Sequence, residues 1–492
     1  MNHIASKNIE PRTNKLTNSH KVVGLEEAIR RTNLRNGMTI SFHHHFRGGD
    51  KVVNMVVDKL AQMGYKDLHL AASSLTDVHE PLIEHIRNGV ITRISTSGLR
   101  GRLAQEISFG LMKEPVVFRS HGSRASAIAN SEIHIDVAFL AASSSDPMGN
   151  AAGYSRSANA KSICGSIGYA LPDAQYADKV VIITDDLVPY PNRPSGIVEM
   201  DVDYVVVVDS VGDSSKIASG AIRDTKNPRD ILLAQQAAKV IINSGYFNTG
   251  FSIQTGSGGA SLAAVKYIRQ SMIDRNIKAS FALGGITAHM VRMHQEGLIE
   301  RLLDVQSFDR VAAESLMSDR MHKEISSIEY ASPTEPGSAT HFLDIVILSA
   351  LEVDTNFNVN VLVGSDGIIR GAIGGHPDTA ADAALSIIVC PLIRGRIPCV
   401  VDKVTTLITP GNTVDVVVTE YGIAVNPLRP DIKQKLQEAK LNILDINILK
   451  EKAEQIIGKP QPLPFGNKTI GVVLGRDGSI IDEIKNIEAK DM

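Results

Sequence analysis

The stretch NTGFSIQTGSGGASLAAVKYIRQSMIDRNIKASFALGG, residues 248–285, contains a complete strand, loop, helix and strand pattern. A short β-rich run at 251–254 leads into a glycine loop at 256–259. Apolar residues then recur at helical spacing, and a second apolar run follows at 279–285. This order is typical of a parallel α/β unit. The helical positions are Leu262, Val265, Ile268 and Met272.

The same parts occur in the same order much earlier, in NGMTISFHHHFRGGDKVVNMVVDKLAQMGYKDLHLAAS, residues 36–73. The run at 38–42 leads to a loop that closes on Gly48 and Gly49, and DLHLAAS reads as the next strand. Two copies of one unit predict a chain built by internal duplication. In this earlier copy, the apolar positions of the helix between the two strands are Val53, Val56, Val57, Leu60 and Met63.

Later segments also match in pairs. ADKVVIITDD and DVDYVVVVDS in the first half are continuous Val/Ile runs, and RIPCVVDKV and TVDVVVTEYG correspond to them in the second. Such runs indicate parallel strands buried on both faces. We therefore predict an α/β fold of two similar, open, mostly parallel domains. The ligand site is expected in the cleft between them.

The predicted boundaries follow changes in composition. Residues 1–20 are polar and read as a flexible arm, residues 21–240 as the first domain, and residues 241–492 as the second. IRDTKNPRD marks the break before a linking helix. The second domain is expected to include a lysine-rich helix after Pro430 and a C-terminal hairpin whose turn is Asp477-Gly478.

Composition excludes several function classes. A net charge of −3, 4% aromatic residues and no tryptophan argue against nucleic-acid binding. Three scattered cysteines suit a reducing cytoplasm. The polar N-terminus has no signal-peptide core, and no run of about 18 apolar residues predicts a membrane span. A soluble, cytoplasmic protein is expected.

The loop at 256–259 matches neither the Walker pattern nor the dinucleotide fingerprint. Its glycines could serve close strand–helix packing and a turn with positive φ. Alternatively, free N–H groups at a helix N-terminus could hold a carboxylate or a developing oxyanion. The loop has no lysine, which favours an acyl group over a polyphosphate. A second double glycine, Gly374-Gly375 in IGGHPD, could contact a linear ligand through its backbone.

The run FHHHFRGG places His43 and His45 on one side of a strand and His44 on the other. An HxH pair could form half of a zinc site, but no third ligand follows at a recognisable spacing. We expect instead that one side is buried and hydrogen-bonded while the other lines the cleft. Arg47 could pair with a substrate carboxylate.

Two further groups carry chemistry that the pattern leaves open. His289, Arg292 and His294 could belong to a solvated helix face or could together bind a polyanion. Glu420 ends a buried strand, where a carboxylate is either catalytic or structurally paired.

Five motifs spread along the chain belong together: SFHHHFRGGD, ASSSDPMGNAAG, TGSGGASLAAVKYI, ALEVDTNFNVNV and GAIGGHPD. In combination they resemble the citrate lyase α-subunit family and, more distantly, the CoA-transferase superfamily. The resemblance extends over roughly residues 20–490.

The resemblance implies a transferase that exchanges acetyl for citryl on the thioester of an acyl carrier protein, or of CoA, and releases acetate. Its implied partners are a β subunit that cleaves the citryl thioester, a γ subunit that is the acyl carrier, and further copies of the chain. No cofactor is expected to be attached to this chain, and no metal. Gly258 and Gly259 would stabilise the oxyanion. The groups expected to bind citrate are Arg47, His44, His289 and Arg292, and those expected to bind the thioester arm are Gly256, Ser257, Gly374 and Gly375.

One departure bears on mechanism. Many CoA-transferases use a glutamate nucleophile in the second domain, whereas LGGITAHMVRMH has none and His289 occupies that place by loose register. The resemblance then implies direct attack of citrate on the acetyl thioester, with Glu420 as an alternative acidic group. Transfer to citramalate, thioester hydrolysis on the same scaffold and a purely scaffolding subunit remain as competing hypotheses.

Overall fold

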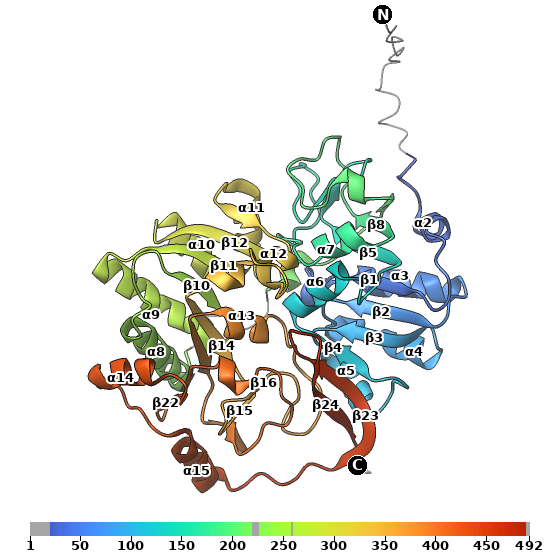
Figure 1. Ribbon diagram of the computed structural model, residues 1–492. Helices are drawn as coiled ribbons and strands as arrows, with labels where there is room; N and C mark the ends of the chain where they lie inside the picture. The colour runs from blue at the N-terminus through green and yellow to red at the C-terminus, as the bar shows by residue number, and fades with distance from the viewer. Residues whose placement is uncertain (1–19, 219–225, 257–258, 489–492) are drawn as a thin grey trace, which may run out of the picture.

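The computed structural model describes residues 20–218, 226–256 and 259–488. The arm predicted at 1–20 therefore falls, except for His20, outside the described residues. Two α/β halves lie side by side, and the chain passes from the first to the second through helix α8 (Pro228–Asn243) (Figure 1). Each half has an apolar core of its own packed against its sheet.

A nine-stranded sheet forms the first half. Its strands pair in parallel except for the last two along the chain, which form an antiparallel hairpin. In spatial order they are β24 (Ile480–Ile487), β23 (Phe465–Leu474), β4 (Val116–Phe118), β3 (Ile91–Thr96), β2 (Leu68–Ala72), β1 (Thr39–Phe42), β5 (Val137–Ala142), β8 (Lys179–Thr184) and β9 (Tyr204–Val207). The α-helices of this half are α2 (Leu25–Arg31), α3 (Val52–Gln62), α4 (Leu82–Arg87), α5 (Gly101–Ser108), α6 (His121–Ala129) and α7 (Leu171–Tyr176).

An eight-stranded sheet forms the second half and is parallel except at its last pair. In spatial order its strands are β13 (His322–Glu324), β12 (Ile299–Ser307), β11 (Ala279–Ile286), β10 (Ser252–Thr255), β14 (Ile345–Ser349), β17 (Leu385–Val389), β21 (Val416–Val418) and β22 (Ile423–Val425). Besides α8, its α-helices are α9 (Gly259–Arg275), α10 (Ala288–Gln295), α11 (Arg310–Ser318), α12 (Ser327–Ala331), α13 (His376–Asp382), α14 (Pro430–Glu438) and α15 (Ile446–Ile457).

Short strands form three smaller sheets. They are β16 (Val359–Asn360) with β15 (Glu352–Asp354) and β20 (Val400–Val401), then β18 (Ile393–Arg394) with β19 (Ile397–Pro398), and β6 (Ser144–Ser145) with β7 (Ala151–Ala152).

The two halves repeat one topology, as the sequence predicts. Strand β1 lies between β2 and β5, and β10 lies between β11 and β14, with parallel pairing throughout. Helix α3 connects β1 to β2, and α9 connects β10 to β11. The fold of two mostly parallel α/β units is therefore confirmed. No helix in the described ranges is long and apolar enough to cross a bilayer.

Two strand assignments made from the sequence are wrong. The C-terminal hairpin forms, with Gly478 at positive φ in its turn, but it joins the first sheet beside β4 instead of the second half (Figure 1). Gly471 permits this contact because a Cβ there would lie 2.9 Å from the Phe118 ring. The pairing covers an edge strand that would otherwise expose unpaired backbone groups. RIPCVVDKV contributes only to small sheets, and β17 takes the place expected for it in the large one.

Buried and partly buried hydrogen bonds across the interface between the two halves, here called the seam, hold the halves together. Asp378 of α13 accepts from Ser120 Oγ at 2.7 Å and from the Gly122 amide at 2.9 Å. The Ile167 amide donates to Glu324 Oε1 at 2.6 Å. Since a buried carboxylate needs such partners, the seam has one fixed register.

Burial raises the pKa of Glu324 to about 7, and the neighbouring Asp304 carboxyl acts in the same direction. Replacing Glu324 by glutamine keeps an acceptor for Ile167 and removes the titration. As pH rises from 4.5 to 7 the unfolded state loses the Glu324 proton first, so the wild type loses unfolding free energy relative to the variant. We expect this difference to change by up to about 3 kcal/mol.

Urea denaturation at several pH values measures the difference. Glu335→Gln, at an exposed glutamate, is the matched control, for which no comparable change is expected. A difference between wild type and Glu324→Gln that stays constant with pH would contradict the prediction.

Candidate active site

A cavity of about 600 Å³ lies between the two halves. It is bordered by the residues that follow β1 and β4 in the first half and β10 and β14 in the second. These are the carboxyl ends of parallel strands, where open α/β sheets bind ligands. The predicted position of the site is thus occupied by a cavity large enough for a small molecule.

The histidine run lies just after β1, which ends at Phe42, and not on the strand as predicted, but its members still divide into a hydrogen-bonded pair and one residue at the cavity. His43 and His45 bond to each other through their Nδ1 atoms, and His43 Nε2 bonds to the Ala141 carbonyl at 3.0 Å. The Tyr169 amide donates to His45 Nε2 at 3.3 Å. These contacts occupy the ring nitrogens of both histidines. His44 instead borders the cavity, with its Nδ1 2.6 Å from Ser73 Oγ.

A stack of neutral rings forms the first-half wall of the cavity. The Tyr169 ring centroid lies 4.2 Å from that of His121 and 5.1 Å from that of His44. Burial lowers the pKa of His121 to about 3 and that of His44 well below its usual value. Both imidazoles are therefore uncharged at neutral pH. His121 Nδ1 is buried and has no hydrogen-bond partner among the described residues.

Arg47 is a half-buried cation in the wall of the cavity. Burial lowers its pKa to about 10, and Arg100 adds to this, so the guanidinium stays charged at neutral pH. Its Cζ lies 4.3 Å from the centroid of the Phe308 ring. Phe308 fits because Gly285 has no side chain, since a Cβ there would lie 2.1 Å from the ring. Arg47 is thus held from both halves while it faces the cavity.

The mouth of the cavity is also cationic. Arg370 forms an ion pair with Asp366, and Arg394 donates to the Ala350 carbonyl at 3.1 Å. With Arg47 they give the cavity an excess of positive charge that suits a polyanionic ligand. The exposed cations at the mouth are Arg100, Lys216, Arg370 and Arg394.

The glycine loop that follows β10 is described only in part. Gly256 borders the cavity, but its amide donates to the Ile347 carbonyl at 2.7 Å and so is not free for a ligand. Gly259 is the first residue of α9 and is not among the described residues that line the cavity. Ser257 and Gly258 lie outside the described residues, so their roles stay predictions.

The second glycine loop reaches across the seam into the cavity. The Gly374 carbonyl accepts from the His121 amide at 2.9 Å, and the Ile373 amide donates to the Ser97 carbonyl at 2.7 Å. Gly374 has φ +58°, a value that favours glycine. Within the described part of the chain, no acceptor meets the amides of Gly374 and Gly375. These amides are available to a ligand.

Besides Gly259, three of the predicted site residues within the described ranges do not line the cavity. Arg292 is exposed on α10, and His289, on the same helix, is half-buried. Glu420 accepts from the Leu392 amide at 2.8 Å, so its carboxylate serves the backbone of a neighbouring loop. His294 bonds to Asp319 and to the Ile299 carbonyl.

Several cavity residues escape the motif search. His121 follows β4 and Arg100 follows β3, so a survey of strand ends would have found both. Gln254 lies on β10, one position before its last residue, Thr255, and directly before the glycine loop. Tyr330 lies on α12, far from any glycine motif, and the sequence gives no signal for it.

Comparison with known structures defines the fold class. The α subunit of a malonate decarboxylase from Acinetobacter baumannii superposes with a TM-score of 0.64 over 90% of this chain and 89% of that chain, at 16% identity. At that identity the likeness shows the fold alone. The class is a pair of similar α/β halves with a cavity at the seam.

Sequence comparison then gives the family. The profile described as "Citrate lyase, alpha subunit" matches residues 18–487, and the chain belongs to this family. The citrate lyase alpha chain of Escherichia coli K12 is 56% identical over 464 residues, which are 94% of this chain and 90% of that one. That of Klebsiella pneumoniae is 56% identical over 467 residues, 95% and 91% of the two chains.

A crystal structure from Streptococcus mutans, described as an α subunit of citrate lyase in complex with citrate, is 57% identical to this chain. It superposes with a TM-score of 0.93 over 95% of this chain and 92% of that chain.

Proposed function

We propose that this chain transfers an acyl-carrier thioester from acetate to citrate, as the α component of a citrate lyase complex. The observation that carries the proposal is the cavity between the two halves, which combines one half-buried arginine with neutral imidazoles and two available loop amides. Citrate carries about three negative charges at neutral pH, which the cationic lining suits. Its named relatives, one of them bound to citrate, support the choice of acid.

The reaction proceeds by exchange of one thioester for another. A citrate carboxylate oxygen attacks the carbonyl of the acetyl thioester, and the carbon–sulfur bond breaks to leave a mixed anhydride and a thiolate. The thiolate then attacks the citryl carbonyl and expels acetate. The thioester bond is retained overall, so no ATP is needed. Both steps place negative charge on a carbonyl oxygen, and donors such as the Gly374 and Gly375 amides stabilise that charge.

The cavity lining fits transfer without a covalent enzyme intermediate. No glutamate is among the described residues that line it. The neutral state of His44 and His121 also suits the reaction, because neither ring would protonate the thiolate that must attack again. In the cell the thiol belongs to the arm of an acyl carrier subunit, and a β subunit cleaves the citryl product.

An assay of the purified chain with acetyl-CoA as the surrogate thioester tests this function. Release of acetate together with citryl-CoA, only when citrate is present, is the expected result. Citramalate in place of citrate tests the related acid. Acetate release without any acid acceptor would mean hydrolysis, and no turnover together with partner binding would mean a scaffold; both would overturn the proposal.

Glu420→Gln tests the covalent alternative. Because Glu420 is bonded to the Leu392 amide and glutamine keeps an acceptor there, the variant should retain turnover within about threefold. Hydroxylamine trapping followed by mass spectrometry should find no modified glutamate in wild type incubated with acetyl-CoA. Complete loss of turnover, with a trapped Glu420 adduct in the wild type, would contradict direct attack.

A further inference from the structure

Tyr330 is a cavity residue to which neither the motifs nor the family name gives a role. It lies on α12, which begins at a capping box formed by Ser326 and Glu329. The side chain is 2% exposed and its ring packs in the apolar cluster beneath the loop of α13. Its hydroxyl end reaches the cavity that Gly375 also borders.

The hydroxyl is held on one side and has an unused proton. Gln254 Nε2 donates to the Tyr330 oxygen at 2.8 Å. A phenol that accepts this bond directs its own hydrogen elsewhere, and among the described residues the Tyr330 hydroxyl donates no hydrogen bond. Burial raises the pKa of Tyr330 well above its usual value, which keeps the hydrogen in place at neutral pH.

The position of this hydroxyl is set by two glycines. Gly284 has φ +94°, and a Cβ there would lie 2.8 Å from Gln254 Cδ, so the absence of a side chain lets Gln254 reach Tyr330. At Gly375 a Cβ would lie 2.4 Å from the Tyr330 oxygen. The hydroxyl therefore lies against the backbone of the loop whose amides are available to a ligand. Donors from α12 and from this loop border the same part of the cavity.

We propose that the Tyr330 hydroxyl donates a hydrogen bond to the acyl carbonyl oxygen as that oxygen gains negative charge, and that Gln254 positions it. The inference deepens the proposed transferase function and rests on it. The step needs no change of protonation, because the phenol stays neutral while the charge forms on the substrate. Tyr330 thereby supplements the loop amides as an oxyanion donor.

Tyr330→Phe removes the hydroxyl and keeps the ring in the apolar cluster. In the acetyl-CoA and citrate assay we expect kcat to fall by about 10²- to 10³-fold, the usual effect of losing one oxyanion donor. The KM for citrate should change less than threefold, because the bond forms mainly in the transition state.

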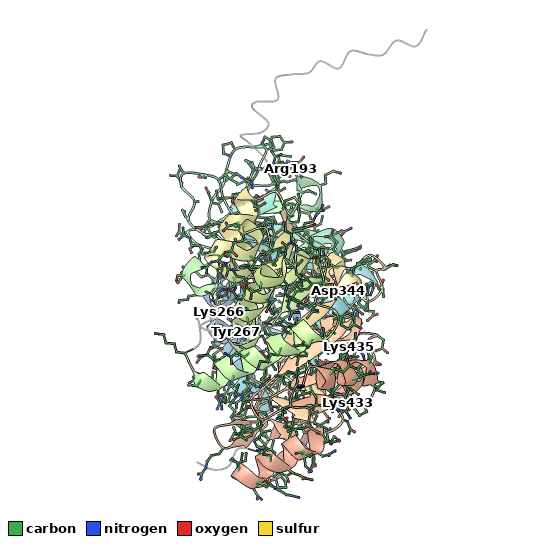
Figure 2. The ribbon with its side chains drawn as sticks, turned by 90° about the vertical axis from the view of Figure 1, so that its left-hand side faces the viewer. Arg193, Lys266, Tyr267, Asp344, Lys433 and Lys435 are labelled. Atoms are coloured by element: carbon green, nitrogen blue, oxygen red, sulfur yellow. The ribbon has the colours of Figure 1, made fainter. Side chains whose placement is uncertain are left out.

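Tyr267→Phe is the matched control. Tyr267, labelled on α9 in Figure 2, also accepts from a glutamine amide, that of Gln235 at 3.4 Å, but it is not among the residues that line the cavity. This variant should keep wild-type kcat. Gln254→Leu should lower kcat by less than Tyr330→Phe, and combining the two should add little, since Gln254 acts through Tyr330. Thermal unfolding checks that each variant is folded.

The outcomes separate the two proposals. Wild type without citrate-dependent transfer would overturn the proposed function and this inference with it. Active wild type with Tyr330→Phe within threefold in kcat would overturn the inference alone. A loss confined to the KM for citrate would also overturn it, because the hydroxyl would then bind citrate in the ground state.

Discussion

Gly375→Ala is expected to lower citrate-dependent turnover by about 10²- to 10³-fold, comparable to the loss of an oxyanion donor. Gly375 has φ −91°, which alanine adopts without strain, so the effect is steric. The added Cβ would lie 2.4 Å from the Tyr330 oxygen and 3.1 Å from two carbons of its ring. The loop or the tyrosine must shift, and the donors lose their common position.

Gly337→Ala is the control for this variant, because its Cβ would meet nothing within 4 Å. It should leave turnover unchanged. Steady-state rates for both variants, with thermal unfolding to confirm that each is folded, are the measurement. A folded Gly375→Ala protein with wild-type kcat would remove the α13 loop from the reaction.

Arg47→Gln should lower kcat/KM for citrate by roughly 30- to 150-fold, or about 2–3 kcal/mol. The guanidinium is half-buried between the two halves, where an ionic bond to a carboxylate is screened less than in bulk water. Glutamine keeps a polar donor of similar length but loses the charge. The KM for acetyl-CoA should change much less, because the thioester group itself is uncharged.

Arg292→Gln provides the contrast. This exposed residue on α10 does not line the cavity, so kcat/KM for citrate should stay within twofold of wild type. Kinetics with citrate varied at saturating acetyl-CoA measure both variants. Equal losses from Arg47→Gln and Arg292→Gln would mean that citrate binds near α10, as the sequence motif first indicated.

The duplicated fold could be predicted because its information is local. Each strand, glycine loop and helix of the repeated unit is encoded within about forty consecutive residues of the two stretches compared. The position of the C-terminal hairpin could not be predicted in this way. Its own strands and turn are visible in the sequence, but the edge strand that it joins lies several hundred residues earlier.

The site was predictable to the extent that its residues lie at strand ends. His44, Arg47, Gly374 and Gly375 belong to such loops, and all border the cavity. The position of Tyr330 depends instead on packing between α12 and the end of β10, which no spacing encodes. His289 and Arg292 follow the end of β11, where site residues were expected, but they lie on α10 and neither lines the cavity.

The pairing of β23 with β4 also limits how this molecule can move and be divided. The polypeptide begins in the first half, forms the second half and then returns to the first. The second half is therefore connected to the first through the chain at both its N-terminal and its C-terminal end. A cut near the link before α8 would leave them connected through the tail. For the same reason, the second half expressed alone would carry β23 and β24 without the sheet that they join. Because unpaired strands promote aggregation, separate expression of the halves is expected to give aggregation-prone fragments.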